Sequence, residues 1–265
     1  PIYMCISDGN YIEHYNDVFR NMYYIEEEKR GFFPEENLSV PGSFEIEIPQ
    51  ESHKEISFVC SLEENIEEIN VKKVINKEII RINELMYESG MIEEKQDIEK
   101  LPKEELKQRK LLRDFIIATD NFIVYRPNFG LHTIIAGYPW FLDWGRDSLI
   151  SFEGLLLETK RYEIAKEVLL TSIRDIKFGL VPNGYSGYDN RPLYNSSDSS
   201  LLLFEAVYKY AKYTGDYKFI EKNIYEKLVL IINNYCKGID LDDNNIFLDI
   251  DGLLSAGTEH TQNTW

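Results

Sequence analysis

Two tryptophans, two aspartates and an arginine crowd one short stretch of the sequence, and their side chains suit the binding of a sugar. They are Trp140, Asp143, Trp144, Arg146 and Asp147, next to a turn that contains Gly and Pro. The C–H faces of a sugar lie on indole rings, while carboxylates and guanidinium groups hydrogen-bond its hydroxyls. The same residues also suit a buried tryptophan corner in which an Arg–Asp pair holds a helix start. Residue types alone leave both interpretations open.

An apolar run at residues 149–152 follows this stretch and predicts a helix. Asp147 or Ser148 is the expected N-cap, because a short side-chain oxygen there accepts one of the unpaired backbone N–H groups. Trp144 and Arg146 would then lie on the loop at the start of the helix. The helix is therefore expected to position the group that could bind a ligand.

A second polar group precedes another predicted helix. Residues 181–185 read Val-Pro-Asn-Gly-Tyr, and Asn195 and Asp198 stand just before the apolar run that starts at Leu201. Asp198 or a neighbouring serine is a candidate N-cap. Capping and ligand binding are compatible here, because both groups would face the same end of the helices.

The composition favours a neutral substrate over a charged one. Asp and Glu outnumber Lys and Arg by 46 to 29, for a net charge of −17. Such a field repels nucleic acid and anionic lipid, so neither partner is expected, although solubility alone also explains the charge. Three distant cysteines without a C-x-x-C spacing favour reduced thiols and a cytoplasmic location. No apolar run approaches the ~20 residues of a membrane span.

The distribution of apolar residues predicts a strand-rich start and a helical remainder. Residues 1–62 show short alternating runs, with one helix expected at 14–28. Residues 63–108 are dense in Glu and Lys and predict a charged helical linker. Helices are expected at residues 111–124, 148–158, 162–178, 198–213 and 217–237. Residues 240–251 resemble a calcium loop only in part, since Asn245 stands where Gly is needed, so we expect a hairpin at Asn244–Asn245 and no metal.

The stretch AGYPWFLDWGRD at residues 136–147 resembles the signature of the glycogen debranching enzyme family, in its amylo-α-1,6-glucosidase part. The resemblance implies that Trp140 and Trp144 form stacking walls. It implies that Asp143, Arg146 and Asp147 hold sugar hydroxyls, that Asn195 and Asp198 complete the rim, and that Trp265 helps to place the general acid. All eight residues are candidate substrate-binding residues.

The resemblance also implies a fold. It predicts an all-α toroid, part of an (α/α)6 barrel, preceded by the last strands of an N-terminal β-sandwich domain. The expected ranges are 1–62 for the end of the β-sandwich, 63–108 for the linker and 109–265 for the first part of the glucosidase domain. Helix faces left uncovered by an unclosed ring would favour self-association.

The activity implied by the resemblance is hydrolysis of α-1,6-linked glucose in glycogen or another branched α-glucan, by an inverting mechanism without a cofactor. In the family, a general acid follows a segment similar to residues 251–257, two positions after Trp265. We therefore assign no catalytic residue to this chain and expect an inactive fragment. Alternatives are another toroid glycosidase, such as a glucoamylase or trehalase relative, and a non-catalytic glucan-binding fragment.

Overall fold

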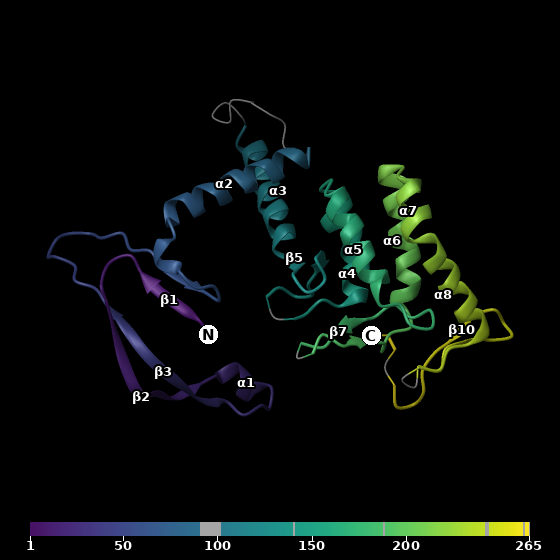
Figure 1. Cartoon of the computed structure of the whole chain (residues 1–265), viewed down its shortest axis with the longest axis horizontal. Helices are drawn as coiled ribbons and strands as arrows, with labels where there is room; N and C mark the ends of the chain where they lie inside the picture. The colour runs from purple at the N-terminus through teal and green to yellow at the C-terminus, as the bar shows by residue number, and fades with distance from the viewer. Residues whose placement is uncertain (91–101, 140, 188, 242–243, 262, 265) are drawn as a thin grey trace. The chain divides into compact units, whose positions relative to one another are not determined.

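The chain forms two compact units in a computed structural model (Figure 1). The structure describes residues 1–265 except 91–101, 140, 188, 242–243, 262 and 265. The first unit comprises Pro1–Ile79 and the second Ile80–Trp265. The ranges 1–62, 63–108 and 109–265 expected from the sequence remain a prediction.

The first unit contains two antiparallel strand pairs. β2 (Asn10–Tyr23) pairs with β3 (Glu35–Glu45), and the short helix α1 (Ile25–Lys29) lies in the connection between them. β1 (Tyr3–Ile6) pairs with β4 (Phe58–Ser61), which precedes the 3-10 turn η1 (Ile66–Glu68). Helix α2 (Val71–Glu88) begins in this unit and ends in the second.

The helix predicted at residues 14–28 is wrong, because most of this range belongs to β2. Tyr15, Val18 and Phe19 have the β-branched or aromatic side chains that fit a pleated surface. Val18 pairs with Ser39 and Phe19 with Leu38, so long-range pairing overrides the local helical spacing. Asn16 and Asn21, with φ of 57° and 58°, lie where the register of the two strands shifts.

The second unit alternates helices with short hairpins. Its elements after α2 are α3 (Lys103–Asn121), β5 (Ile123–Arg126), β6 (Leu131–Ile134), α4 (Gly145–Phe152), the π-helical turn η3 (Glu153–Leu157), α5 (Tyr162–Arg174), β7 (Gly184–Tyr185), β8 (Pro192–Leu193), α6 (Ser199–Thr214), α7 (Tyr217–Asn223), α8 (Tyr225–Lys237), β9 (Phe247–Leu248) and β10 (Leu254–Ser255). β5 pairs with β6, β7 with β8 and β9 with β10, all antiparallel.

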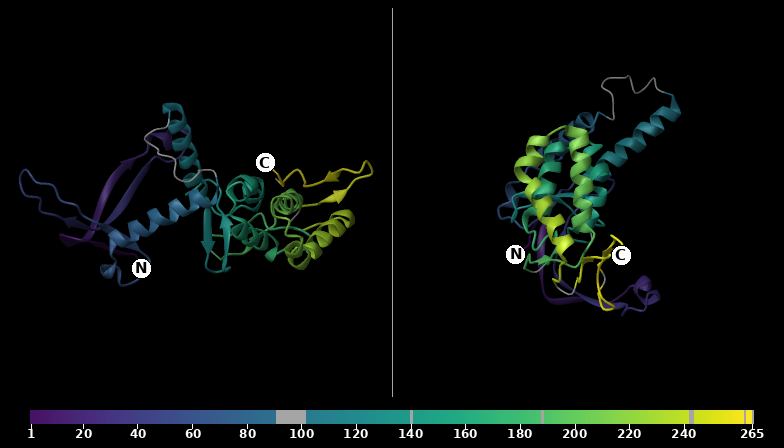
Figure 2. Two further views of the ribbon diagram at one scale, coloured as in Figure 1. Left: turned by 90° about the horizontal axis from the view of Figure 1, so that it is seen from above. Right: turned by 90° about the vertical axis from the view of Figure 1, so that its right-hand side faces the viewer.

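Helices α4, α5, α6 and α8 lie side by side and enclose the core of the second unit (Figure 2). On α6 the buried residues Leu203, Ala206, Val207 and Tyr210 recur at intervals of three and four, which places them on one face. Phe152 of α4 is fully buried in the same core. Packing of these faces fixes the ends of the helices relative to one another.

The predicted fold class is wrong. The described residues combine helices with five two-stranded antiparallel sheets, which is a mixed architecture and not an all-α toroid after a β-sandwich. Residues 123 and 124, expected to end the helix at 111–124, instead form β5 together with Tyr125 and Arg126. Their sequence Ile-Val-Tyr favours extended backbone, and the chain turns back after Arg126 to supply β6 as a partner.

The helix expected at residues 217–237 is divided into α7 and α8, with Ile224 between them and fully buried. Asn223 donates its side-chain Nδ2 to the carbonyl of Phe219 at 2.9 Å, a local bond that competes with helix continuation. In the part of the chain that the structure describes, no helix combines the length and apolar character needed to cross a membrane.

Gly145 and Gly154 should respond in opposite directions to alanine, although they are nine positions apart in one helical segment. A Cβ at Gly145 would come within 2.4 Å of the carbonyl oxygen of Pro182, whereas at Gly154 it would meet no atom within 4 Å. We expect Gly145→Ala to lower the free energy of unfolding by about 1–3 kcal/mol. Gly154→Ala should raise it by about 0.4–1 kcal/mol, since glycine weakens a helix.

Urea unfolding followed by circular dichroism measures both changes. Destabilisation of similar size at the two positions would contradict the close approach of the Gly145 backbone to residue 182.

Candidate functional site

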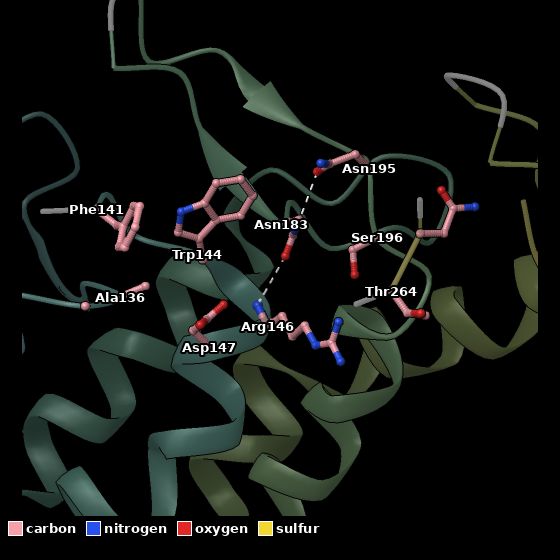
Figure 3. Close-up of a pocket in the computed structure, with 11 residues that line it drawn as sticks. Ala136, Phe141, Trp144, Arg146, Asp147, Asn183, Asn195, Ser196 and Thr264 are labelled. Atoms are coloured by element: carbon pink, nitrogen blue, oxygen red, sulfur yellow. Dashed lines mark hydrogen bonds between the residues drawn. The ribbon is translucent and has the colours of Figure 1, made fainter. Parts of the chain in front are cut away.

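A hollow of about 630 Å³ lies where α4 and α6 begin (Figure 3). Its volume falls in the range of about 300–1,000 Å³ that is usual for small-molecule sites. The residues around it come from four segments of the second unit. They are Ala136, Gly137, Phe141, Trp144, Arg146, Asp147, Asn183, Asn195, Ser196, Asn263 and Thr264.

The hollow has an aromatic wall and a polar wall. Phe141 and Trp144 stand on one side, and Asn195, Ser196 and Thr264 stand on the other (Figure 3). Phe141 is 62% exposed, and its ring lies close to Gly137, where a Cβ would be 2.7 Å from the ring. An apolar face opposite a row of hydrogen-bonding groups matches the two kinds of surface that a sugar ring presents.

Asp143 and Trp144 point to different sides of the chain. Trp144 has extended backbone, with φ −97° and ψ 123°, and forms an antiparallel bridge with Gly184. Successive side chains of extended backbone point in opposite directions, so Trp144 lines the hollow while Asp143 is turned away from it. Asp143 lies at a separate cavity of about 20 Å³ and is 4% exposed.

Burial dominates the electrostatics of Asp143. Burial raises the pKa of its carboxyl group, and the positive charge of Arg126 opposes this effect in part. Arg126 Nη2 lies 3.6 Å from Asp143 Oδ1, and hydrogen bonding from the Thr133 side chain and the backbone N–H of Asp143 lowers the pKa of this carboxyl group by less than burial raises it. This environment suits a group that holds the loop in place more than one that binds a hydroxyl.

Arg146 and Asp147 belong to the first turn of α4, and both line the hollow. Arg146 Nε forms an ion pair with Asp198 Oδ2 at 3.2 Å. Asp198 is not among the residues that line the hollow, and its other carboxylate oxygen accepts a bond from Ser196 Oγ at 2.5 Å. Asp198 therefore orients Arg146, and Asp147 supplies the carboxylate that faces the hollow.

Asn183 links the segments that surround the hollow. Its Oδ1 accepts from the backbone N–H of Arg146 at 3.4 Å and from Ser199 Oγ at 3.2 Å. Its Nδ2 donates to Asn195 Oδ1 at 3.3 Å. Its backbone carbonyl accepts from the N–H of Gly145 at 2.7 Å. One residue thus connects the start of α4, the start of α6 and the loop between them.

The helix caps differ in part from the expected ones. α4 begins at Gly145, so Asp147 and Ser148 lie inside the helix and do not cap it. Asn183 performs that function from a distant segment, because its oxygens accept from the first two N–H groups of the helix. Asp198 does occupy the N-cap position of α6, but the side chain that accepts there is Ser196, from Ser199 N–H at 3.1 Å.

Asn244 and Asn263 tie the final segment of the chain to the hollow. Asn263 O accepts from the N–H of Ser197 at 3.0 Å, and Asn263 Nδ2 donates to Asn244 O at 2.9 Å. Asn244 Nδ2 also donates to the carbonyl of Tyr194. Asn244 and Asn245 lie in the turn between Ile239 and Ile246, which pair as an antiparallel bridge, as expected from the sequence. Asn244 is also 1% exposed and braces the segment before α6.

The structure brings together part of the set chosen from the sequence. Trp144, Arg146, Asp147 and Asn195 line one hollow, whereas Asp143 and Asp198 lie beside it and hold other residues. Trp140 and Trp265 lie outside the described residues. Sequence reasoning did not select Asn183, Phe141, Ser196, Asn263 or Thr264, and only the turn sequence Pro-Asn-Gly around Asn183 carried a local signal.

Comparison with known families places the chain in a class of enzyme domain. A sequence model of the amylo-alpha-1,6-glucosidase family matches residues 117–265, which is more than half of the chain. The chain therefore belongs to this family, in agreement with the resemblance seen at residues 136–147. The matched range includes every segment that lines the hollow.

One particular relative is the glycogen debranching enzyme of Saccharomyces cerevisiae (strain ATCC 204508 / S288c). The two sequences are 35% identical over 95 residues, a segment that covers 34% of this chain and 6% of the yeast enzyme. The chain thus matches only a small part of the length of this relative.

The raised pKa of Asp143 predicts a pH-dependent contribution to stability. The folded protein binds this proton more tightly than the unfolded chain, so stability should fall as the pH rises from 3.8 through the raised pKa, and stay level above it. Each tenfold difference in proton affinity between the folded and unfolded chain corresponds to about 1.4 kcal/mol of stability. Arg126→Met removes the opposing charge and should raise the pKa of Asp143 further.

A 13C NMR titration of the Asp143 carboxyl carbon, in the unchanged chain and in Arg126→Met, measures both effects. The assignment comes from the resonance that disappears in Asp143→Asn. A titration of Asp143 at or below the usual aspartate range would contradict the burial of this carboxyl group.

Proposed function

We propose that the chain contributes the sugar-binding part of a glycoside hydrolase that removes α-1,6-linked glucose from branched α-glucans such as glycogen. The observation that carries this proposal is the hollow with an aromatic wall at Trp144 and a polar wall at Asn195. Membership in the amylo-alpha-1,6-glucosidase family and the likeness to a yeast glycogen debranching enzyme support the choice of linkage.

Five of the residues that line the hollow contact the sugar in this proposal. A glucose ring lies with its C–H face against Trp144 and Phe141. Asp147 accepts hydrogen bonds from sugar hydroxyls, and Arg146, oriented by Asp198, donates to them. Asn195 completes the polar wall. Trp140 and Trp265 remain predicted contacts.

The proposal assigns binding, and not proton transfer, to the residues described. Inverting hydrolysis needs two carboxyl groups about 6.5–9.5 Å apart, one as acid and one as base. Among the described residues that line the hollow, Asp147 is the one that carries a carboxyl group. We therefore propose that the 265-residue chain binds branched glucan without cleaving it, and that the whole enzyme acts by inversion.

Calorimetric titration of the chain tests this function. We expect a maltooligosaccharide with one α-1,6-linked glucose to bind more tightly than the linear α-1,4 sugar of equal length. Trp144→Ala should weaken binding of the branched sugar about tenfold, since the ring loses its apolar partner. Tyr208→Ala, at an exposed position of α6 that does not line the hollow, is the matched control and should bind as the unchanged chain does.

Three results would count against the proposal. A lack of binding to both sugars would remove the hollow as a glucan site. A preference for the linear sugar would favour a different toroid glycosidase. Release of glucose by this chain alone, measured with a glucose oxidase assay, would show that the residues present suffice for catalysis.

A further inference from the structure

The hydrogen bonds of Asn183 determine which end of the Asn195 amide faces its neighbour. The backbone nitrogen of Arg146 is always a donor, so the Asn183 atom that meets it at 3.4 Å must be the side-chain oxygen. The other polar end of Asn183 is then its NH2 group, which only donates. The atom of Asn195 that receives this bond at 3.3 Å must accept, and is therefore the Asn195 carbonyl oxygen.

Asn183 has little freedom to reverse this arrangement. Asn183 is 8% exposed, and Ser199 Oγ donates to the same oxygen at 3.2 Å. The serine hydroxyl could bond to either end of the amide, whereas the backbone N–H of Arg146 requires the oxygen. Turning the amide over would set its NH2 group against the N–H of Arg146, so that two donors would face each other. The N–H group of Arg146 at the start of α4 thus sets the orientation of the Asn183 amide. The hydrogen bond from Asn183 Nδ2 then sets the orientation of the Asn195 amide.

We propose that Asn183 is a positioning residue that makes Asn195 present N–H donors, and not a carbonyl oxygen, to a sugar hydroxyl in the hollow. This inference rests on the proposed function, because it concerns how the same hollow recognises the hydroxyl groups of the sugar. Asn195 is exposed at the hollow and keeps its two N–H groups for this contact, whereas its oxygen is occupied by Asn183.

The polarity matters because a hydroxyl group has one hydrogen to donate and two lone pairs that accept. Asp147 provides an acceptor in the same hollow. With Asn195 as a donor, Asn195 and Asp147 together offer a hydroxyl both a donor and an acceptor. With Asn195 reversed, both residues would offer an acceptor, and the lone pairs of the sugar oxygen would lose the donor at Asn195.

Asn183→Asp isolates this effect. The new carboxylate keeps the acceptor for Arg146 N–H and Ser199 Oγ, but it replaces the donor toward Asn195 with another acceptor. Asn195 would then turn its NH2 group toward residue 183. We expect the affinity for the α-1,6-branched maltooligosaccharide to fall about five- to tenfold. This is a small effect for the loss of a hydrogen bond, because Asn195 is exposed and water can replace part of the contact.

A double-mutant cycle separates positioning from a general effect on folding. Asn183→Asp should weaken binding in the unchanged chain but should add no further loss to Asn195→Ala, because the residue through which it acts is then absent. An equal loss in both backgrounds, or no loss in either while the unchanged chain binds, would overturn the inference.

Asn195→Asp tests the polarity without a change at the buried position. It retains an oxygen for Asn183 Nδ2 and replaces the two N–H donors, so its affinity should be at least as low as that of Asn195→Ala. Binding as tight as in the unchanged chain would show that residue 195 acts as an acceptor, and this result holds even if Asn183→Asp does not fold.

Hydrogen exchange of the side-chain amides supplies a readout that needs no sugar. The NH2 group of Asn183 should exchange its hydrogens slowly in the unchanged chain and faster in Asn195→Ala. Equal exchange rates in the two chains would show that Asn183 does not donate a hydrogen bond to Asn195. Failure of the unchanged chain to bind either sugar would overturn the proposed function and the sugar contact together. A failed cycle with normal binding by the unchanged chain would overturn the inference alone.

Discussion

The start of α4 is the constraint on which the rest of the site depends. A helix leaves its first N–H groups without partners inside the helix, and the side chain of Trp144 at the N-cap position cannot accept from them. Asn183 accepts from two of them, through its backbone and side-chain oxygens. Gly145 permits this contact because a larger residue would meet the backbone of residue 182. A backbone requirement thus joins two segments that lie far apart in the sequence.

The same junction forms the hollow. Residues 144 and 184 pair as extended backbone, so the side chains of Trp144 and Asp143 point in opposite directions. The indole of Trp144 therefore forms one wall of the hollow, and the carboxyl group of Asp143 lies at a separate small cavity, near Arg126. Hydrogen bonds continue from Asn183 to Asn195 and Ser199, and from Ser197 to the segment at residue 263. Hydrogen bonds thus tie the start of α4 to the start of α6, and the start of α6 to the final segment of the chain.

Asp143 and Asp147 show how two like residues in one motif acquire different roles. Asp147 lies in the first turn of a helix at the edge of the hollow, where a carboxylate can meet a sugar. Asp143 is almost fully buried, and burial raises its pKa despite the nearby guanidinium of Arg126. Arg126 also donates to Asn190 Oδ1 at 3.2 Å, so the same side chain contacts Asp143 and a neighbouring loop.

The sequence alone identified the family and the stretch from Trp144 to Asp147, because these depend on residue types at close spacing. It also placed Asp198 at the start of α6, since capping is a local property. It did not reveal that most of residues 14–28 and all of residues 123–126 form strands, because strand pairing depends on partners far along the chain or on how the chain turns back. Nor did it reveal the side to which Asp143 points or the part that Asn183 plays. Those properties arise only when distant backbone groups satisfy one another's hydrogen bonds in the folded chain.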